Sequence, residues 1–234
     1  MTELTCRQEH DVLTVEVDRP PANLLTLQMC EELTRLLLDP PEGARILRLR
    51  ASGDRFCMGR ERAAEGTEDL GREVGVLIAL NEAFERSRLV TVTEVQGDAA
   101  GFGVGLVALS DVSLAKRSAR LSFPEVTVDL APALVLAWLP RVVGRREAFW
   151  LTASGEAVGA DRAMEIGLLN GVVDTDEQLR AAADERVALL TAHSARIHSE
   201  IRAMLSSMAD LTQAQAYELS RDRLVIGSMR RRRT

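Results

Sequence analysis

The sequence predicts an α/β protein, in which strands and helices alternate along most of the chain. Short apolar runs with strand-like patterns are repeatedly followed by segments in which apolar residues recur at helical spacing. Proline and glycine separate these segments. With 234 residues, of which 46% are hydrophobic, the chain is long enough to bury a sizeable core.

The first predicted elements are a strand and a helix. Residues 12–17, VLTVEV, place every second apolar side chain on one face, as in a half-buried strand. Apolar residues at helical spacing then predict an amphipathic helix over residues 26–38, which the pair Pro40-Pro41 ends.

The middle of the chain continues the alternation. A second strand is expected from Ile46 towards Phe56, then a helix around residues 74–84, and then a strand over residues 89–95. This order of elements favours crossover units rather than separate blocks of strands and helices.

The chain changes character after Asp174. Up to Leu224 it has no strand pattern and no proline, and it is rich in Ala, Leu, Arg and Glu. We expect three consecutive helices over residues 176–190, 194–208 and 212–225. Because such a tail cannot bury all its apolar faces alone, it should pack on the core or on another subunit.

Residues 97–125 form the most informative stretch. Four glycines in it, Gly97, Gly101, Gly103 and Gly105, allow the backbone to approach a ligand closely. The apolar run that follows predicts a helix whose first amides point at the bound group and can hold an oxyanion. The alternative is a tight strand-to-helix connection without a ligand.

Four segments follow one another in a characteristic order: DRPPANLL at residues 18–25, FCMGRE at 56–61, the stretch 97–125, and ADRAMEIGLLNGVV at 160–173. Together they resemble the crotonase, or enoyl-CoA hydratase/isomerase, superfamily over residues 8–175. The resemblance implies a crotonase-like spiral of ββα repeats with a C-terminal helical region. The domains would then be a spiral core, residues 1–175, and a trimerisation region, residues 176–234.

The resemblance also implies a chemistry, in which two main-chain amides polarise a thioester carbonyl and stabilise an enolate. Carried over to this chain, the donors are the amides of Arg60 and Phe102. Phe102 could instead be a wedge in the core, and the Arg60 guanidinium could bind the phosphate or ribose of CoA or lie in an exposed loop. The expected substrate contacts are Asn23, Leu24, Met58, Gly59, Arg60 and Gly101.

The acid and base residues depart from the hydratase pattern. Family hydratases use two carboxylates; the position of the first is Gly105 here, whereas the second matches Glu125. One carboxylate is enough to move a proton between two carbons, and superfamily members with a single carboxylate at this position include enoyl-CoA isomerases. Alternatively, Glu125 only stabilises the start of a helix after Pro124.

Asp129 is a second candidate acid. It lies four residues after Glu125, and an i, i+4 pair shares a face if the segment is helical. Two close carboxylates would raise one pKa and create an acid/base pair. The alternative is a turn residue, or the N-cap of a helix containing residues 133–143.

The residues after Pro132 are bulky where relatives carry a glycine-rich turn, which indicates a filled or strongly apolar acyl pocket over residues 133–139. Enoyl-CoA isomerisation or hydration is the nearest activity. The open alternatives are a thioester hydrolase or decarboxylase of the same superfamily, and a catalytically degenerate CoA-binding subunit. Carrier-protein thioesters could replace CoA.

Charge and cysteine content narrow the partners. A net charge of −6 argues against nucleic acid as a partner. The arginine run at residues 230–233 could suggest an anionic partner, but we interpret it as a solvated, frayed chain end. Three scattered cysteines and a first segment without signal-peptide features favour a cytoplasmic protein. We expect no membrane span, no metal and no covalently bound cofactor, with coenzyme A entering as part of the substrate. The expected assembly is a homotrimer or a hexamer.

Overall fold

The computed structural model describes residues 3–62 and 66–231, and it divides the chain into two compact units, residues 1–195 and 196–234. The first unit includes helix α7 (Asp176–Thr191), whereas the trimerisation region expected from the sequence begins at residue 176. Of the arginine run at residues 230–233, Arg232 and Arg233 lie outside the described residues.

The first unit is built on a six-stranded sheet. Its strands β2, β3, β5, β7 and β10 run parallel, and β1 pairs with β2 as an antiparallel hairpin. In sheet order the strands are β1 (Leu4–Glu9), β2 (Val12–Val17), β3 (Ile46–Ala51), β5 (Val90–Val95), β7 (Val112–Lys116) and β10 (Gly171–Val173).

The chain enters a second, four-stranded sheet directly after β3, β5 and β7 of the first. Three of its strands are parallel, and the last is antiparallel to its neighbour. In sheet order they are β4 (Arg55–Cys57), β6 (Asp98–Ala100), β8 (Arg120–Ser122) and β9 (Val158–Gly159). The successive units β3-β4-α2, β5-β6-α3 and β7-β8 with its following helices are turns of one spiral, so the predicted spiral of ββα repeats is confirmed.

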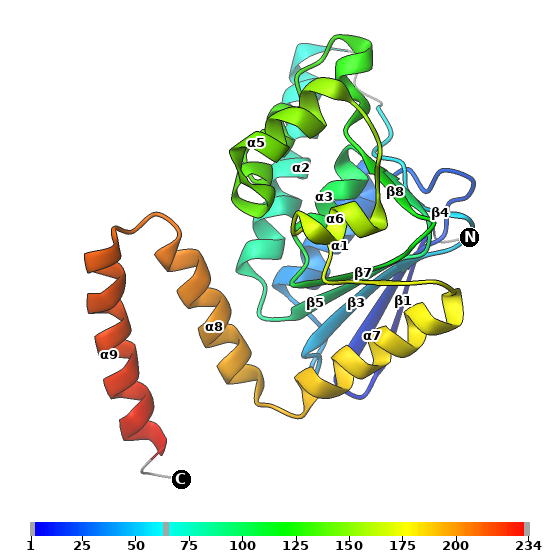
Figure 1. The fold of residues 1–234 in the computed structure, drawn as a ribbon. Helices are drawn as coiled ribbons and strands as arrows, with labels where there is room; N and C mark the ends of the chain where they lie inside the picture. Colours follow the sequence, from blue (N-terminus) through cyan, green and yellow to red (C-terminus); the bar gives the residue numbers. More distant parts are fainter. Residues whose placement is uncertain (1–2, 63–65, 232–234) are drawn as a thin grey trace. The chain divides into compact units, whose positions relative to one another are not determined.

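Helices cover both faces of the large sheet (Figure 1). Neighbouring residues of β3 face opposite sides, so Leu47 belongs to the main core and Ile46 to a smaller cluster beneath α7. In that cluster Leu179 and Ala183 of α7 pack on Val90. A capping box at Thr175 begins α7, so this helix is fixed both by its start and by its apolar face.

The helices on the face of the large sheet opposite α7 include those that the apolar spacing of the sequence predicted. Helix α1 (Leu27–Leu38) begins where the Oγ1 atom of Thr26 accepts from the Met29 amide at 3.2 Å, and it ends as predicted at residue 38. Helix α2 (Thr67–Arg86) buries Leu77 and Phe84 in the same core. Helix α6 (Ala160–Glu165) precedes β10.

The expected helix through residues 133–143 is wrong in one respect, because the segment is broken. Helix α4 (Ala133–Leu136) stops after one turn, and α5 (Leu139–Ser154) begins anew with Pro140 in its first turn. A non-helical Gly144, with φ 79°, kinks α5 further. The break orients Trp138 inward, where only 7% of its surface stays exposed.

The second unit consists of α8 (Ala195–Met208), except for its first residue, and α9 (Gln213–Arg231). Arg230 of α9 pairs with Glu200 of α8 at 2.6 Å. Both helices keep large apolar side chains exposed, among them Ile201, Leu205 and Leu224. The three helices predicted for the tail are therefore present, and the last is longer than expected.

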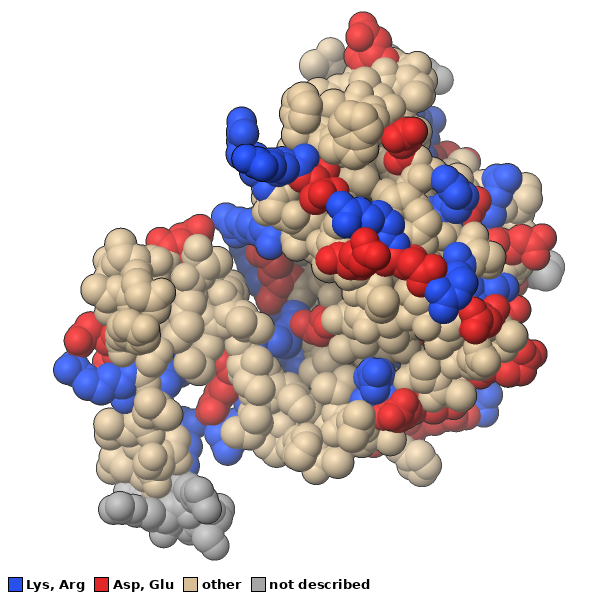
Figure 2. Space-filling view, viewed as in Figure 1, with Lys and Arg blue, Asp and Glu red and all other residues tan. Residues whose placement is uncertain are grey.

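The visible surface carries both signs of charge intermingled (Figure 2). Ion pairs account for part of this pattern, such as Arg117 with Asp174 at 2.7 Å and Arg162 with Glu147 at 2.7 Å. In residues 3–62 and 66–231, no helix combines the length and the apolar character that crossing a membrane requires.

Candidate active site

Two loops of the spiral, one after β4 and one after β6, lie against each other. A β-carbon added to Gly103 would overlap the carbonyl group of Cys57, and one added to Gly59 would lie 3.6 Å from the carbonyl oxygen of Ala100. Glycine is therefore required at position 103 for close backbone packing. The contact brings the FCMGRE segment beside the glycine-rich bend, as the sequence motifs imply.

The glycine-rich bend ends in helix α3 (Phe102–Ala108). Gly101 has φ +51° and donates its amide to the Ser122 carbonyl oxygen at 2.9 Å, which fixes the bend to β8. Phe102 is the first residue of α3, and an amide in that position has no acceptor within its own helix. Its side chain is half-buried and packs against the core, as the wedge alternative anticipated.

The loop after β4 is held by the segment that precedes α1. Leu25 donates to the Gly59 carbonyl oxygen at 3.0 Å and accepts from the Glu61 amide at 2.8 Å. In a parallel bridge of this kind, the residue between the two bonds turns its own N–H to the other side. The amide of Arg60 therefore points away from Leu25. The Met58 amide donates to the Ala22 carbonyl oxygen at 2.9 Å.

Asn23 and Leu24 order the segment that carries Leu25. Asn23 is fully buried with φ 48°, and its Oδ1 atom accepts from the Arg19 amide at 2.8 Å. Its Nδ2 atom donates to the carbonyl oxygens of Ser52 at 2.8 Å and Arg55 at 2.7 Å. The Leu24 carbonyl oxygen accepts from the Arg19 guanidinium at 3.0 Å. The Asn23 side chain thus joins its own loop to the connection between β3 and β4.

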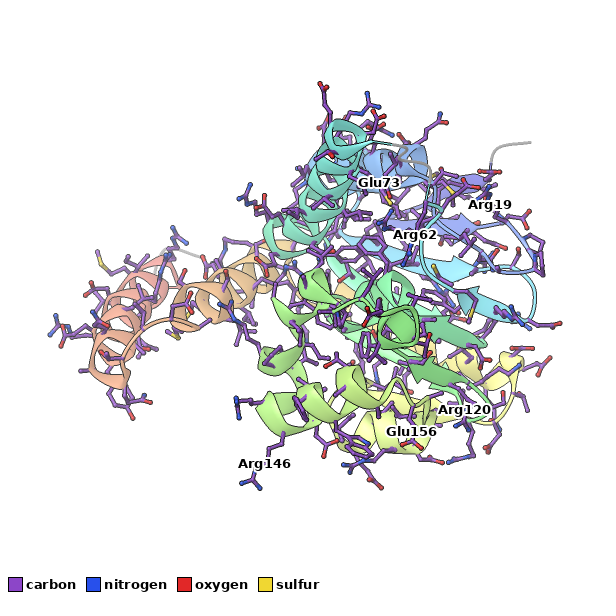
Figure 3. All side chains as sticks on the ribbon, turned by 90° about the horizontal axis from the view of Figure 1, so that it is seen from above. Arg19, Arg62, Glu73, Arg120, Arg146 and Glu156 are labelled. Atoms are coloured by element: carbon purple, nitrogen blue, oxygen red, sulfur yellow. The ribbon has the colours of Figure 1, made fainter. Side chains whose placement is uncertain are left out.

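The Arg60 guanidinium pairs with Glu73, a buried residue of α2 that the sequence did not single out. Burial, together with the neighbouring charge of Arg62, lowers the pKa of the Arg60 guanidinium. Figure 3 labels Glu73 on α2 and Arg62 in the loop before this helix. In the sequence, Glu73 is visible only as a carboxylate within the predicted helix. Its pairing with Arg60 becomes apparent only in the fold.

Glu125 lies in a short 3₁₀ helix, η1 (Pro124–Val128), directly after β8. A β-carbon added to Gly101 would come within 2.7 Å of its Oε1 atom, so the carboxylate lies over the α-carbon of Gly101. Its Oε2 atom is buried without a hydrogen-bond partner. Burial raises the pKa of the Glu125 carboxyl, and the charge of Arg62 opposes this change. A raised pKa makes the carboxylate a stronger base than an exposed one, which suits a group that takes up a proton and returns it.

Asp129 ends η1 in a left-handed conformation, with φ 58° and ψ 36°. Its amide donates to the Val126 carbonyl oxygen at 3.2 Å, and the residue is exposed. The N-cap of α4 is Pro132, so the N-cap alternative for Asp129 is wrong: the residue lies in the turn that ends η1. Asp129 and Arg145 edge a largely apolar cavity of about 540 Å³ between η1 and α5.

Gly105 occupies the position of the first carboxylate of family hydratases, and it is buried in α3. A β-carbon there would be 3.5 Å from Cζ2 of Trp138. Of residues 133–139, Val135, Trp138 and Leu139 are buried, whereas Leu136 is 41% exposed and lines the apolar cavity. In the described part of the chain, no cluster of three or more His, Cys, Asp or Glu residues could hold a metal ion.

This arrangement of a two-sheet spiral, a glycine-rich bend and a half-buried carboxylate against that bend is that of a crotonase-type protein. The model of the enoyl-CoA hydratase/isomerase family matches residues 7–228. The chain belongs to this family.

Individual relatives agree with this assignment. The mitochondrial enoyl-CoA hydratase domain-containing protein 3 of Xenopus laevis is 31% identical over 80% of this chain and 67% of its own length. The trans-2-decenoyl-[acyl-carrier-protein] isomerase of Streptococcus mutans is 26% identical over 93% of this chain and 87% of its own. A solved enoyl-CoA hydratase from Mycobacterium smegmatis aligns with a TM-score of 0.91 at 28% identity, over 98% of this chain and 92% of that one.

Proposed function

We propose that this protein acts on acyl-CoA thioesters and stabilises their enolates, with Glu125 as the acid and base. The reaction that the site supports best is migration of a double bond between the 3-enoyl and 2-enoyl forms. The observation that carries the proposal is the contact of the Glu125 carboxylate with Gly101, one residue before the start of α3. This contact places a general acid/base beside the N-terminus of α3, where main-chain amides can stabilise negative charge.

The negative charge would develop on the thioester oxygen, between the amides of Arg60 and Phe102. The Phe102 amide opens α3, and the Arg60 amide faces away from its bridge partner Leu25. Main-chain donors in a buried site stabilise an oxyanion strongly because they need no reorganisation during the reaction. Met58, Gly59 and Gly101 shape the two loops, and Asn23 and Leu24 order the segment before α1 that bonds the loop after β4. Since the Arg60 guanidinium pairs with Glu73, Arg60 contributes to this site through its amide.

Proton transfer needs one carboxylate. The ionised Glu125 removes the C2 proton of a 3-enoyl thioester, and the electrons of that C–H bond enter a dienolate whose oxygen carries the charge. The protonated Glu125 then delivers the proton to C4, the C2–C3 double bond forms, and the thioester carbonyl is restored. Atoms and electrons balance without a further reactant, and the raised pKa of Glu125 suits both transfers.

Hydration is less well supported than isomerisation. It requires a base for the attacking water in addition to the proton donor, and Gly105 supplies no side chain. The name of the Streptococcus mutans relative, an acyl-carrier-protein isomerase, supports the same choice. It also makes a carrier-linked thioester the second substrate to test.

The experiment is exchange of the C2 proton of a medium-chain enoyl-CoA in deuterated water, for wild type and Glu125→Gln. We expect the variant to lose about 10²–10⁴ in rate, as for removal of a positioned acid/base, with CoA affinity retained. Glu156→Gln, at an exposed carboxylate, is the matched control and should exchange normally. Wild-type exchange by Glu125→Gln would remove Glu125 from the mechanism and favour a hydrolase or a non-catalytic CoA-binding subunit.

A further inference from the structure

Trp138 joins the two elements that carry the proposed chemistry. Its Cζ2 atom faces Gly105 in α3, at 3.5 Å from the position of a β-carbon. Its ring centroid lies 6.2 Å from that of Phe123, with the planes inclined at 57°. Phe123 is the residue directly before η1, which carries Glu125. The indole is 7% exposed, so it is part of the packed interior.

The two partners of Trp138 differ in what they offer. Phe123 is 1% exposed and provides an aromatic face in the favourable tilted arrangement. Gly105 leaves a gap in the surface of α3, which a large side chain at this position would close. The indole therefore packs between Gly105 of α3 and Phe123, which precedes η1.

We propose that Trp138 is a positioning residue, which holds η1 against α3 so that the Glu125 carboxylate stays over Gly101 and water stays out. The proposal rests on the function proposed above. Its physical basis is that the oxyanion donor and the acid/base lie on different elements. The pairing of β6 with β8 and the Gly101–Ser122 hydrogen bond fix the backbones before the two elements, whereas the packing of Trp138 fixes η1 against α3 beyond them. A shift of about 1 Å in such a site costs on the order of 10² in rate.

The pKa of Glu125 provides a second measurement, because its Oε2 atom is buried. Of the described charged groups, Arg62 acts on this carboxylate and opposes the effect of burial, whereas Asp129 is exposed at the end of η1. If Trp138 keeps water out, its loss hydrates the carboxylate, and the pKa of Glu125 falls towards its ordinary value. A change in stability alone would not move this pKa.

The test uses a size swap between the two facing positions. Trp138→Ala should lower kcat for C2-proton exchange about 10²-fold at little change in KM, and should move the acid limb of the pH profile to lower pH. Gly105→Leu should lower kcat from the opposite side, because it pushes the indole away. The double variant Gly105→Leu/Trp138→Ala should recover most of the rate, since the added side chain fills the space vacated. Gly105→Ala, whose β-carbon makes an ordinary contact, should be near wild type.

Leu151→Ala provides the stability control, because Leu151 is a buried residue of α5 in the same core. It should lower Tm without altering kcat or the pH profile of the folded enzyme. If Trp138→Ala does not fold, Trp138→Phe replaces it, since the shorter ring cannot reach Gly105 as the indole does. Unchanged kcat and pH profile in the Trp138 variant, or no recovery in the swap, would overturn the proposal. Glu125→Gln tests the proposed function by itself. If that variant is inactive and the Trp138 variants behave as wild type, the positioning role fails while the proposed function stands.

Discussion

The carboxylate of Glu125 rests on the α-carbon of Gly101, with Oε1 within 2.7 Å of the place where a β-carbon would stand. The contact links η1, which follows β8, to the bend that follows β6. It is possible because residue 101 has no side chain and adopts φ +51° and ψ −118°, a conformation that residues with a β-carbon avoid.

This relationship predicts the effect of Gly101→Ala. The added methyl group should displace the Glu125 carboxylate, and the backbone conformation should cost a further 1–3 kcal/mol, roughly as for other strained residues. We expect about 10²-fold slower C2-proton exchange per folded molecule, together with a lower Tm.

Gly75→Ala is the matched control for this substitution. Gly75 lies within α2, and no atom lies within 4 Å of its added β-carbon. Alanine there should stabilise the helix by up to about 1 kcal/mol and leave exchange unchanged. Wild-type exchange in Gly101→Ala would contradict the contact between Gly101 and Glu125.

The raised pKa of Glu125 predicts a pH-dependent stability difference. Folding favours the protonated carboxyl, so the folded state binds more protons between the unfolded and folded pKa values, and stability falls as pH rises through this window. Glu125→Gln removes the cost of burying the charge. The variant should therefore have a higher Tm than wild type at pH 7, and this advantage should shrink towards pH 4. Thermal melts at several pH values measure it, and an advantage that grew on acidification would contradict the assigned direction.

Asp129→Asn separates a turn residue from a second acid. Asparagine tolerates the left-handed conformation that Asp129 adopts at the end of η1, so both Tm and turnover should stay near wild type. Asp129→Ala should instead lose about 1 kcal/mol, because alanine avoids this conformation. A large fall in turnover of Asp129→Asn at unchanged Tm would show that Asp129 is an acid after all.

The exposed apolar stripe of α8 predicts self-association. Ile197, Ile201 and Leu205 recur at i, i+4 and i+8, and all three are exposed in the single chain. We propose that these helices assemble the protein into a trimer or a hexamer, and light scattering should find one of these masses. Leu205→Glu should shift the mass downward, whereas Ser206→Glu, one position round the helix, should have less effect. A monomer at micromolar concentration would contradict the proposal.

The sequence alone determined the order and kind of the elements, because these depend on local patterns. The alternation in residues 12–17, the apolar spacing of α1 and the glycines of the bend each predict a structure that is present. The four motifs in register also determined the family, and they singled out Glu125 and Gly101 by their types and separations.

Only the tertiary structure decided which distant residues meet. The partner of Arg60 is Glu73, the Asn23 side chain orders loops within the protein, and the gap at Gly105 is faced by Trp138. The break between α4 and α5 turns that indole inward, in place of the single helix expected to contain residues 133–143. None of these pairings has a periodic signal, because a contact across the core depends on how the spiral stacks its turns, whereas local pattern records only which face of an element is buried.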